Sequence, residues 1–442
     1  MFSLIRLPRV FTINQVPKVF HEDSIISGYR HPRSSATDCV LSLFQLTNET
    51  LNIWTHFLPT WYFLWKLVTV VLMQTAWQDS FTWPLVIFLI SCCIYPLASS
   101  CAHTFSSMSA RARHICFYFD YAALSFYSLG SATIYSAYVF PDKWVNGLFH
   151  QCYLPIAVLN TLFCTGLACY SRLGLPFLQY NHDTIKRFPE FRRPRFSKIL
   201  RVVAFAYPCL FVNIPLLYRV FLCEGDGCTD NETNFLHCHH ITLAFLTGFL
   251  FATHLPERLA PGSFDYIGHS HQLFHVCGIL GTHFQMKAVE QDMEARRPWL
   301  LDHSIPITLS NSLGVAVLCV LLNLIIIGLY SLPLITAPVC QAEKYDKTRH
   351  LKTENKQKDE KRPLIQLPIW LQEVPLENDK QGMKKGEEEA GEEGEKGEGG
   401  EEEAGEEGEK GEKEDGEDGE ERNEEDREGK ERARRNDEGE MV

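Results

Sequence analysis

The segment His271-Gln272-Leu273-Phe274-His275 opens an apolar run and carries two histidines four positions apart. On a helix, residues with this spacing share a face and lie about 40° and about 6 Å from each other. Imidazoles on a hydrophobic helix are costly to expose to lipid, so we expect both to turn inward and find partners on other helices. The segment therefore predicts a membrane helix with a polar inner face.

Outward from this segment, eight apolar runs of membrane-spanning length can be counted. They lie at about residues 51–73, 83–104, 115–140, 147–170, 199–222, 237–256, 270–288 and 309–332. The second, sixth and seventh runs are the least clean, so seven spans is the alternative count. The pattern predicts an all-α, polytopic membrane helical bundle, with a seven-helix core and an eighth C-terminal transmembrane helix.

The average composition hides two unlike parts of the chain. From Glu387 to the C-terminus, 28 acidic residues accompany nine Lys and Arg, a net charge of −19 that leaves about +6 for the first 386 residues. Gly-Glu-Lys repeats without aromatic residues cannot bury enough apolar surface to offset ordering entropy, so we expect a disordered tail. The predicted domains are a cytosolic N-terminal segment, a transmembrane helical domain and a cytosolic Glu/Gly/Lys-rich tail, at residues 1–48, 49–335 and 336–442.

The cysteine pattern argues against a disulfide-rich protein and a cysteine zinc site, and the first residues argue against a cleaved signal peptide. The 15 cysteines are scattered, many of them inside apolar runs, which favours buried cysteines acting as small hydrophobic residues. They form neither a disulfide framework nor a Cys-x-x-Cys zinc site. No basic start is followed by a short apolar run, so no cleaved signal peptide is expected. The expected surroundings are the lipid bilayer, and no nucleic-acid partner is expected.

Loop charges predict the orientation of the bundle. Lys and Arg gather in the N-terminal segment, in the second loop (Arg111 and Arg113) and in the fourth loop, whereas the first and fifth loops have none. The positive-inside rule then places the N-terminus in the cytosol, and eight spans return the C-terminus there. The seventh loop is an exception, because it carries Lys287, Arg296 and Arg297 on the predicted outer side. Nearby acidic residues reduce its net positive charge.

The fifth loop supports the same orientation. Asn231-Glu232-Thr233 matches the glycosylation acceptor pattern, which makes Asn231 a glycosylation candidate on the outer side. Three cysteines flank this acidic loop, where a disulfide would be permitted. They are Cys223, Cys228 and Cys238.

Polar groups from three predicted helices arrive at a similar depth below the cytosolic edge. His103 ends the second run, Asp120 lies early in the third, and the seventh carries His271 and His275 in its first turns. At 1.5 Å per residue, Asp120 and His275 both lie roughly 10 Å below that edge. Ser99 precedes His103 by one turn, on the same face.

Three histidines with an open position form the arrangement that zinc adopts in catalytic sites. Burial in lipid disfavours the charged imidazolium, which helps metal binding. We therefore predict that His103, His271 and His275 bind Zn²⁺, with Asp120 and Ser99 positioning an imidazole or a water molecule, including in any catalysis. The alternative is that each histidine satisfies a backbone carbonyl inside the bundle.

Other histidines fit this site less well. His283 is about 12 Å along the helix from His275 and about 80° round it, too far to be a fourth ligand. His56 and His254 lie at inner ends of runs, where a polar rim or structural capping is expected. The outer edge of the sixth run carries three histidines that we expect to be solvated: His237, His239 and His240.

Four motifs together resemble the progestin and adipoQ receptor family, over roughly residues 15–335. They are Glu49-Thr50-Leu51-Asn52-Ile53-Trp54-Thr55-His56, Ser99-Ser100-Cys101-Ala102-His103, Phe119-Asp120-Tyr121 and His269-Ser270-His271-Gln272-Leu273-Phe274-His275. Further stretches, among them Leu255-Pro256-Glu257-Arg258, look like the membrane progestin receptor branch and its gamma group in particular. Two features depart from that pattern: an insertion of about fifteen residues around 174–191, and the tail from Gly386.

The resemblance implies a plasma-membrane receptor for progestins that signals rapidly, with a heterotrimeric G protein as a candidate partner. It also implies zinc at the three histidines, supported by Asp120 and Ser99. The steroid pocket cannot be assigned to residues; an apolar cavity between helices, entered from the bilayer, is expected.

The sequence favours three other functions less strongly. The zinc arrangement also looks like that of intramembrane ceramidases, so a zinc-dependent lipid amide hydrolase is the main alternative. A channel or transporter is less favoured, because no paired interrupted helices occupy corresponding halves. A rhodopsin-like receptor is disfavoured because the third run does not end in Asp-Arg-Tyr and the orientation is inverted.

Overall fold

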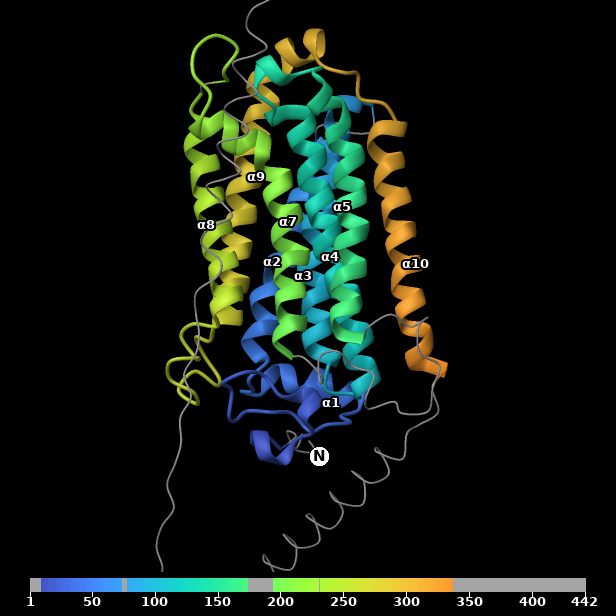
Figure 1. Cartoon of the computed structure of the whole chain (residues 1–442), viewed down its shortest axis with the longest axis vertical. Coiled ribbons are helices and arrows are strands. Elements are labelled where there is room, and N and C mark those ends of the chain that lie inside the picture. The colour runs from blue at the N-terminus through green and yellow to red at the C-terminus, as the bar shows by residue number, and fades with distance from the viewer. Residues whose placement is uncertain (1–8, 74–77, 174–193, 230, 337–442) are drawn as a thin grey trace, which may run out of the picture. The chain divides into compact units, whose positions relative to one another are not determined.

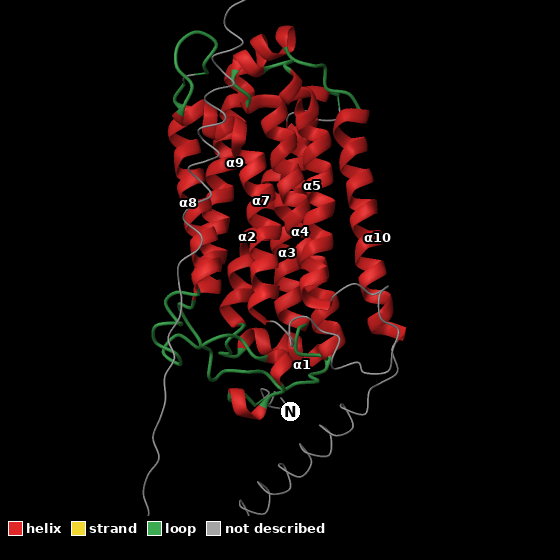
Figure 2. Cartoon of the chain, in the orientation of Figure 1, coloured by secondary structure: helices red, strands yellow, loops and turns green. Residues whose placement is uncertain are grey.

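The computed structural model describes residues 9–73, 78–173, 194–229 and 231–336. The predicted fourth-loop insertion and acidic tail lie outside these residues. The long helices are α2 (Thr50–Met73), α3 (Trp83–Phe105), α4 (Ala110–Ile134), α5 (Leu148–Leu173), α7 (Pro194–Phe221), α8 (Thr233–Thr253), α9 (Ser270–His303) and α10 (Val315–Thr336). They correspond in order to the eight predicted runs, although α9 is longer than its run, and the described part of the chain contains no β-strand element (Figures 1 and 2). The all-α prediction is confirmed.

Five of the described helical segments are long and apolar enough to cross a membrane. They are Ser80–Phe105, Leu148–Arg172, Phe196–Leu222, Thr233–Thr253 and Ser310–Thr336. The other three long helices, α2, α4 and α9, are less apolar because they carry interior polar residues, among them His56, Asp120 and His275. Helices of this kind face a bundle interior, which is how intramembrane polar groups are normally accommodated.

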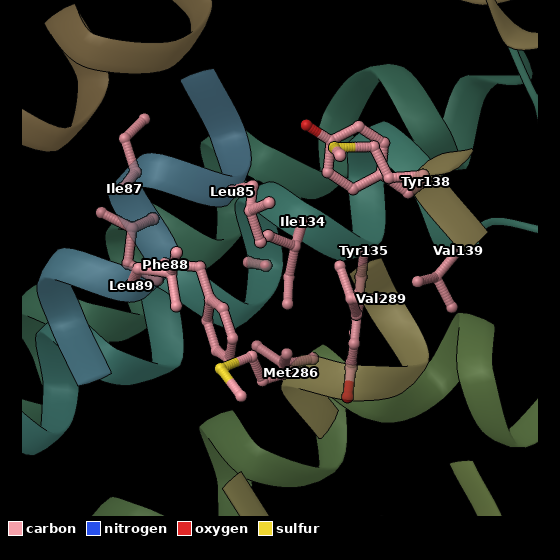
Figure 3. Close-up of a cluster of buried hydrophobic side chains, with 14 of the residues drawn as sticks. Leu85, Ile87, Phe88, Leu89, Ile134, Tyr135, Tyr138, Val139, Met286 and Val289 are labelled. Atoms are coloured by element: carbon pink, nitrogen blue, oxygen red, sulfur yellow. The ribbon is translucent and has the colours of Figure 1, made fainter. Parts of the chain in front are cut away.

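The core of the bundle is centred on the packing of α3, α4 and α9, whose buried side chains include Phe88, Ile134 and Met286 (Figure 3). Close approach of α3 and α4 depends on Gly130. A Cβ atom added there would lie 2.3 Å from Ser91 Oγ and 3.3 Å from the backbone Cα of Phe88. Small residues at such crossings let membrane helices pack by van der Waals contact, since lipid provides no hydrophobic force between them.

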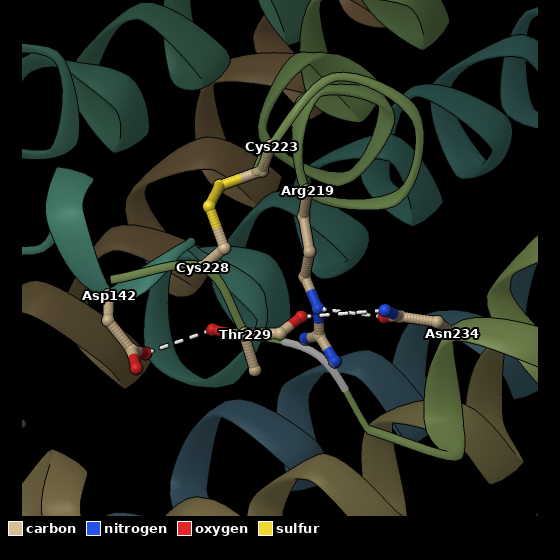
Figure 4. Close-up of a disulfide and its surroundings, with 6 residues drawn as sticks. All are labelled: Asp142, Arg219, Cys223, Cys228, Thr229 and Asn234. Atoms are coloured by element: carbon tan, nitrogen blue, oxygen red, sulfur yellow. Dashed lines mark hydrogen bonds between the residues drawn. A yellow bond between two sulfur atoms is a disulfide. The ribbon is translucent and has the colours of Figure 1, made fainter. Parts of the chain in front are cut away.

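At one end of the bundle, the loop between α7 and α8 is closed by a disulfide between Cys223 and Cys228, beside Arg219 (Figure 4). This loop lies at the opposite end of the bundle from the N-terminal segment (Figure 1). A disulfide persists in an oxidising compartment, so the bond agrees with the expected outer location of this loop. Cys238, which was also expected to flank the loop, is a free thiol.

Two of the three histidines of α8 that are expected to be solvated are buried instead. His237 is completely buried and donates from Nε2 to Asp292 Oδ2 at 2.9 Å, while His240 is buried with its Nδ1 3.0 Å from the carbonyl oxygen of Gly281. His239 is half-buried. The apolar pattern predicts a lipid–water boundary at this end of the run, whereas α9 is 34 residues long and its Gly281 and Asp292 contact two of the histidines.

Asn231, the glycosylation candidate, belongs to the same buried network. Its Nδ2 donates to Asp292 Oδ1 at 3.1 Å, and its Oδ1 accepts from Arg219 Nη2 at 2.9 Å. A glycan would be attached to that nitrogen, which keeps one N–H after attachment, and glycosylation of the half-buried Asn231 stays a prediction.

At the other end, the N-terminal segment before α2 folds against the helix ends. The Arg30 guanidinium is buried and donates to the carbonyl oxygens of His103 and Thr104, so it caps the last turn of α3. Asp265, in the loop between α8 and α9, accepts from the backbone N–H groups of Ile26 and Ser27 at 2.9 and 2.7 Å. The segment is therefore fixed to two separate parts of the bundle.

Candidate metal site

Three imidazoles converge where the end of α3 meets the start of α9. One ring nitrogen from each of His103, His271 and His275 lies within 4.8 Å of the other two, and the Nε2 atoms of His103 and His271 are 3.1 Å apart. His103 and His275 are buried, with 4% and 1% of their surface exposed, whereas His271 is half-buried. The structure thus brings together the three side chains that the sequence predicts to meet.

The donor set and its spacing fit zinc. Around a tetrahedral ion with Zn–N bonds of about 2.0–2.1 Å, ligand nitrogens lie roughly 3.3 Å apart. The 3.1 Å separation of the His103 and His271 nitrogens is close to that spacing, and all three nitrogens lie within 4.8 Å of one another. Zinc at this site stays a prediction, for which the three histidines supply the ligands and leave a fourth position open.

The nitrogens that face away from the cluster are held by the first turn of α2 and the residue before it. His103 Nδ1 donates to Glu49 Oε2 at 2.7 Å, and His275 Nδ1 donates to the backbone carbonyl of Asn52 at 3.1 Å. Thr55 Oγ1 also lies 3.1 Å from His275 Nδ1. Because Nδ1 is engaged in both rings, both Nε2 atoms remain for a shared ligand.

Glu49 lies in one of the family motifs, and the sequence does not predict a role for it at the metal site. The signal that could have found it is the spacing of Glu49, Asn52 and His56, which puts all three on one face of a helix. Burial by itself would raise the pKa of the Glu49 carboxyl, but the contact with His103 and the nearby guanidinium groups of Arg30 and Arg113 hold that pKa well below its usual range.

His56 lies inside the cluster rather than at a polar rim. Its ring stacks on His275 with centroids 3.6 Å apart and planes 15° from parallel, and it meets the Tyr95 ring edge-on. His56 is 5% exposed, and its Nδ1 has no hydrogen-bond partner in the described part of the chain. The histidine therefore supports the ring of one predicted ligand from the side of α2.

The two residues predicted to support the site are placed differently from Glu49. Ser99 is buried and Asp120 is half-buried, and within the described residues neither forms a hydrogen bond to the three histidines. Glu49 makes the carboxylate contact to His103 instead. Roles for Asp120 and Ser99, including a catalytic one, stay predictions.

The start of α9, which carries two of the histidines, is fixed by a buried carboxylate. Glu257 Oε2 accepts from the backbone N–H of Ser270 at 2.7 Å, and Glu257 is 2% exposed. A negative charge at a helix N-terminus satisfies free N–H groups and complements the helix dipole. His269 Nε2 also lies 3.3 Å from the Asn48 carbonyl oxygen, which joins α9 to the residues before α2.

Comparison with known protein families covers the part of the chain that carries this cluster. A sequence profile described as haemolysin-III related matches residues 44–286, a range that contains the three histidines and Glu49. The chain belongs to the haemolysin-III-related family. Within this family, the chain is 70% identical over 335 residues to membrane progestin receptor gamma-B of Danio rerio, covering 76% of this chain and 96% of that protein.

Two human relatives of the family are similar over almost their whole length. Membrane progestin receptor delta is 53% identical over 340 residues, with 76% of this chain and 94% of that protein covered. Membrane progestin receptor gamma is 51% identical over 338 residues, with 76% and 97% covered. The predicted resemblance to the membrane progestin receptor branch and its gamma group is confirmed. The 70% identity to the zebrafish gamma-B receptor supports the gamma group, whereas the human delta and gamma receptors are almost equally similar to this chain.

Proposed function

We propose that this protein is a plasma-membrane receptor for progestins with a zinc site near its cytosolic face. The observation that carries the proposal is the convergence of three imidazole nitrogens within 4.8 Å, in a chain whose relatives are named membrane progestin receptors. His103, His271 and His275 would hold the ion, which would supply structural cross-linking of α3 to α9 and a Lewis acid for an oxygen atom of a ligand.

The proposed orientation has the N-terminus and the histidine cluster on the cytosolic side. It is supported by the basic second and fourth loops and by the Cys223–Cys228 disulfide at the opposite end. A cytosolic partner such as a heterotrimeric G protein would then meet the end of the bundle that carries the N-terminal segment. The steroid would enter between helices from the bilayer, since a lipophilic ligand partitions there first.

A second candidate is a zinc-dependent lipid amide hydrolase. The observation that favours it is that three histidines converge, which would leave a fourth coordination position open, as in catalytic zinc sites. In that function the cluster would bind a carbonyl oxygen of the substrate, and Asp120 would accept a proton from water.

Metal analysis of the purified full-length protein tests the zinc site that both candidate functions share. We expect about one zinc per chain in metal analysis, and loss of the metal in H103A and H271A. H283A is the matched control, because His283 lies on the same helix as His271 but pairs with Tyr62 through its Nδ1 at 2.7 Å. A wild-type protein without zinc would contradict the metal site.

Binding of labelled progesterone and hydrolysis of ceramide distinguish receptor from enzyme. The receptor proposal expects saturable steroid binding and no release of product from ceramide. Ceramide turnover that disappears in H271A but persists in H283A would favour the hydrolase, and absence of steroid binding would contradict the receptor. Loss of steroid binding after chelation would link the pocket to the metal, whereas unaffected binding would separate them.

A further inference from the structure

The N-terminal end of α2 forms a third wall of the histidine cluster, beside α3 and α9. Glu49 and Asn52 both reach the outward nitrogens of ligand rings, Glu49 through its carboxylate and Asn52 through its backbone carbonyl. The two residues are also joined to each other, since Asn52 Nδ2 donates to Glu49 Oε2 at 2.8 Å. One short stretch of chain thus holds two rings that come from two other helices.

The Glu49 carboxylate is fixed in one place. Glu49 is 6% exposed, its backbone N–H donates to Thr47 Oγ1 at 3.2 Å, and one carboxylate oxygen receives both the Asn52 amide and the His103 imidazole. Rotation of the side chain would leave a buried charge without partners, which is costly. The carboxylate is therefore a rigid acceptor for the His103 ring.

A neutral imidazole has one N–H donor and one nitrogen lone pair, and the partner of one nitrogen determines which is which. A carboxylate accepts but cannot donate, so its contact with His103 Nδ1 requires the proton on that nitrogen. The lone pair is then on Nε2, the atom that lies 3.1 Å from His271 Nε2. Histidines that bind metals are commonly oriented by a carboxylate in this way.

We propose that Glu49 is a positioning residue for the metal site: it sets the tautomer and the ring orientation of His103. This inference rests on the proposed zinc site and names the carboxylate of the residue before α2, in place of Asp120 or Ser99, as the group that prepares His103 for the ion. The competing interpretation is that Glu49 and His103 form a buried structural pair with no effect on metal binding. The two interpretations differ in a measurable way, because only the first links Glu49 to metal affinity.

The test compares zinc affinity with the stability of metal-free protein. Full-length wild type, E49Q and E49D are purified in detergent, stripped with a chelator, and titrated with zinc in competition with a chelator of known affinity. Loss of a carboxylate that orients a metal-binding histidine costs about 10- to 100-fold in affinity. We expect a loss in that range for E49Q, an intermediate loss for E49D, which keeps the charge on a shorter side chain, and wild-type affinity for E290Q.

E290Q is a matched control because Glu290 also pairs with a cation, Lys66 at 3.5 Å, but on a part of α9 remote from the histidines. Wild-type zinc affinity in E49Q, with or without a lower unfolding temperature of the metal-free form, would overturn the role of Glu49 and leave the zinc site intact. A wild-type protein that binds no zinc would overturn both proposals. If E49Q does not fold, E49D decides, and wild-type affinity in E49D would count against the inference.

Discussion

Arg219 of α7 and Asp292 of α9 form a doubly hydrogen-bonded ion pair in which neither side chain is exposed. Nη1 donates to one carboxylate oxygen at 2.7 Å and Nη2 donates to the other at 3.0 Å. His237 of α8 donates to the same carboxylate at 2.9 Å, so the pair joins three helices. A buried carboxylate with this many partners depends on all of them, because each unpaired buried charge carries a desolvation cost.

Removal of the arginine should destabilise the protein strongly. In R219M the Asp292 carboxylate loses its counter-charge while staying buried, which costs about 3–5 kcal/mol. We expect a clear fall in the unfolding temperature of the purified protein, measured by the fluorescence of a thiol-reactive dye. The control is K66M, which breaks the partly exposed Lys66–Glu290 pair and should cost at most about 1 kcal/mol. Equal effects of the two substitutions would contradict the buried network.

The crossing of α3 and α4 should be sensitive to a single methyl group. In G130A the new Cβ would meet Ser91 Oγ at 2.3 Å and the Phe88 backbone at 3.3 Å, so the helices must move apart. Overpacking of this kind costs about 1–3 kcal/mol. G166A, on α5, is the control, since its Cβ has no neighbour within 4 Å among the described residues and Ala favours the helix by about 1 kcal/mol. Unfolding temperatures that fall for G166A and not for G130A would contradict the packing described.

The N-terminal segment should detach when Asp265 loses its charge. In D265N one oxygen becomes an amide donor that faces the N–H groups of Ile26 and Ser27, and a hydrogen bond to a charged group is worth about 1.5–3 kcal/mol. We expect faster limited proteolysis in the first forty or so residues, followed by mass spectrometry of the fragments. D302N, at an exposed residue, should be cleaved like wild type. Unchanged proteolysis of D265N would show that other contacts hold the segment.

The orientation predicts which epitopes are accessible on intact cells. A tag placed at Asp226, inside the disulfide-closed loop, should be stained without permeabilisation. A tag at the N-terminus should be stained only after permeabilisation, because the basic loops predict a cytosolic location for that end. The reverse pattern would overturn both the orientation and the cytosolic location of the histidine cluster.

The sequence predicted the helices well, because eight apolar runs of spanning length leave few alternatives in a bilayer. It also predicted the meeting of His103, His271 and His275, since depth along a helix follows directly from residue counting. It missed Glu49, which lies just before an apolar run, where depth alone indicates a solvated residue. The folded N-terminal segment covers that position, and apolar periodicity carries no information about such long-range contacts.

The expectation that His237 and His240 of α8 are solvated is wrong for the same physical reason. Their exposure depended on how far α9 extends beyond the apolar core, and the hydrophobic pattern ends before the helix does. The partner of His237 is Asp292, which a hydropathy argument assigns to a loop. Buried ion pairs between helices, such as this one, therefore cannot be predicted from the positions of the apolar runs.

The bond between the Ile26 N–H and the Asp265 carboxylate joins residues 239 positions apart. During synthesis the N-terminal segment leaves the ribosome first, yet the acceptor it needs is among the last parts of the bundle to be translated. The segment lacks this acceptor until six of the long helices have been translated, and His271 and His275 follow later still, in α9. The site therefore forms late in biogenesis. Ribosome-stalled chains that end before α9 would not contain it.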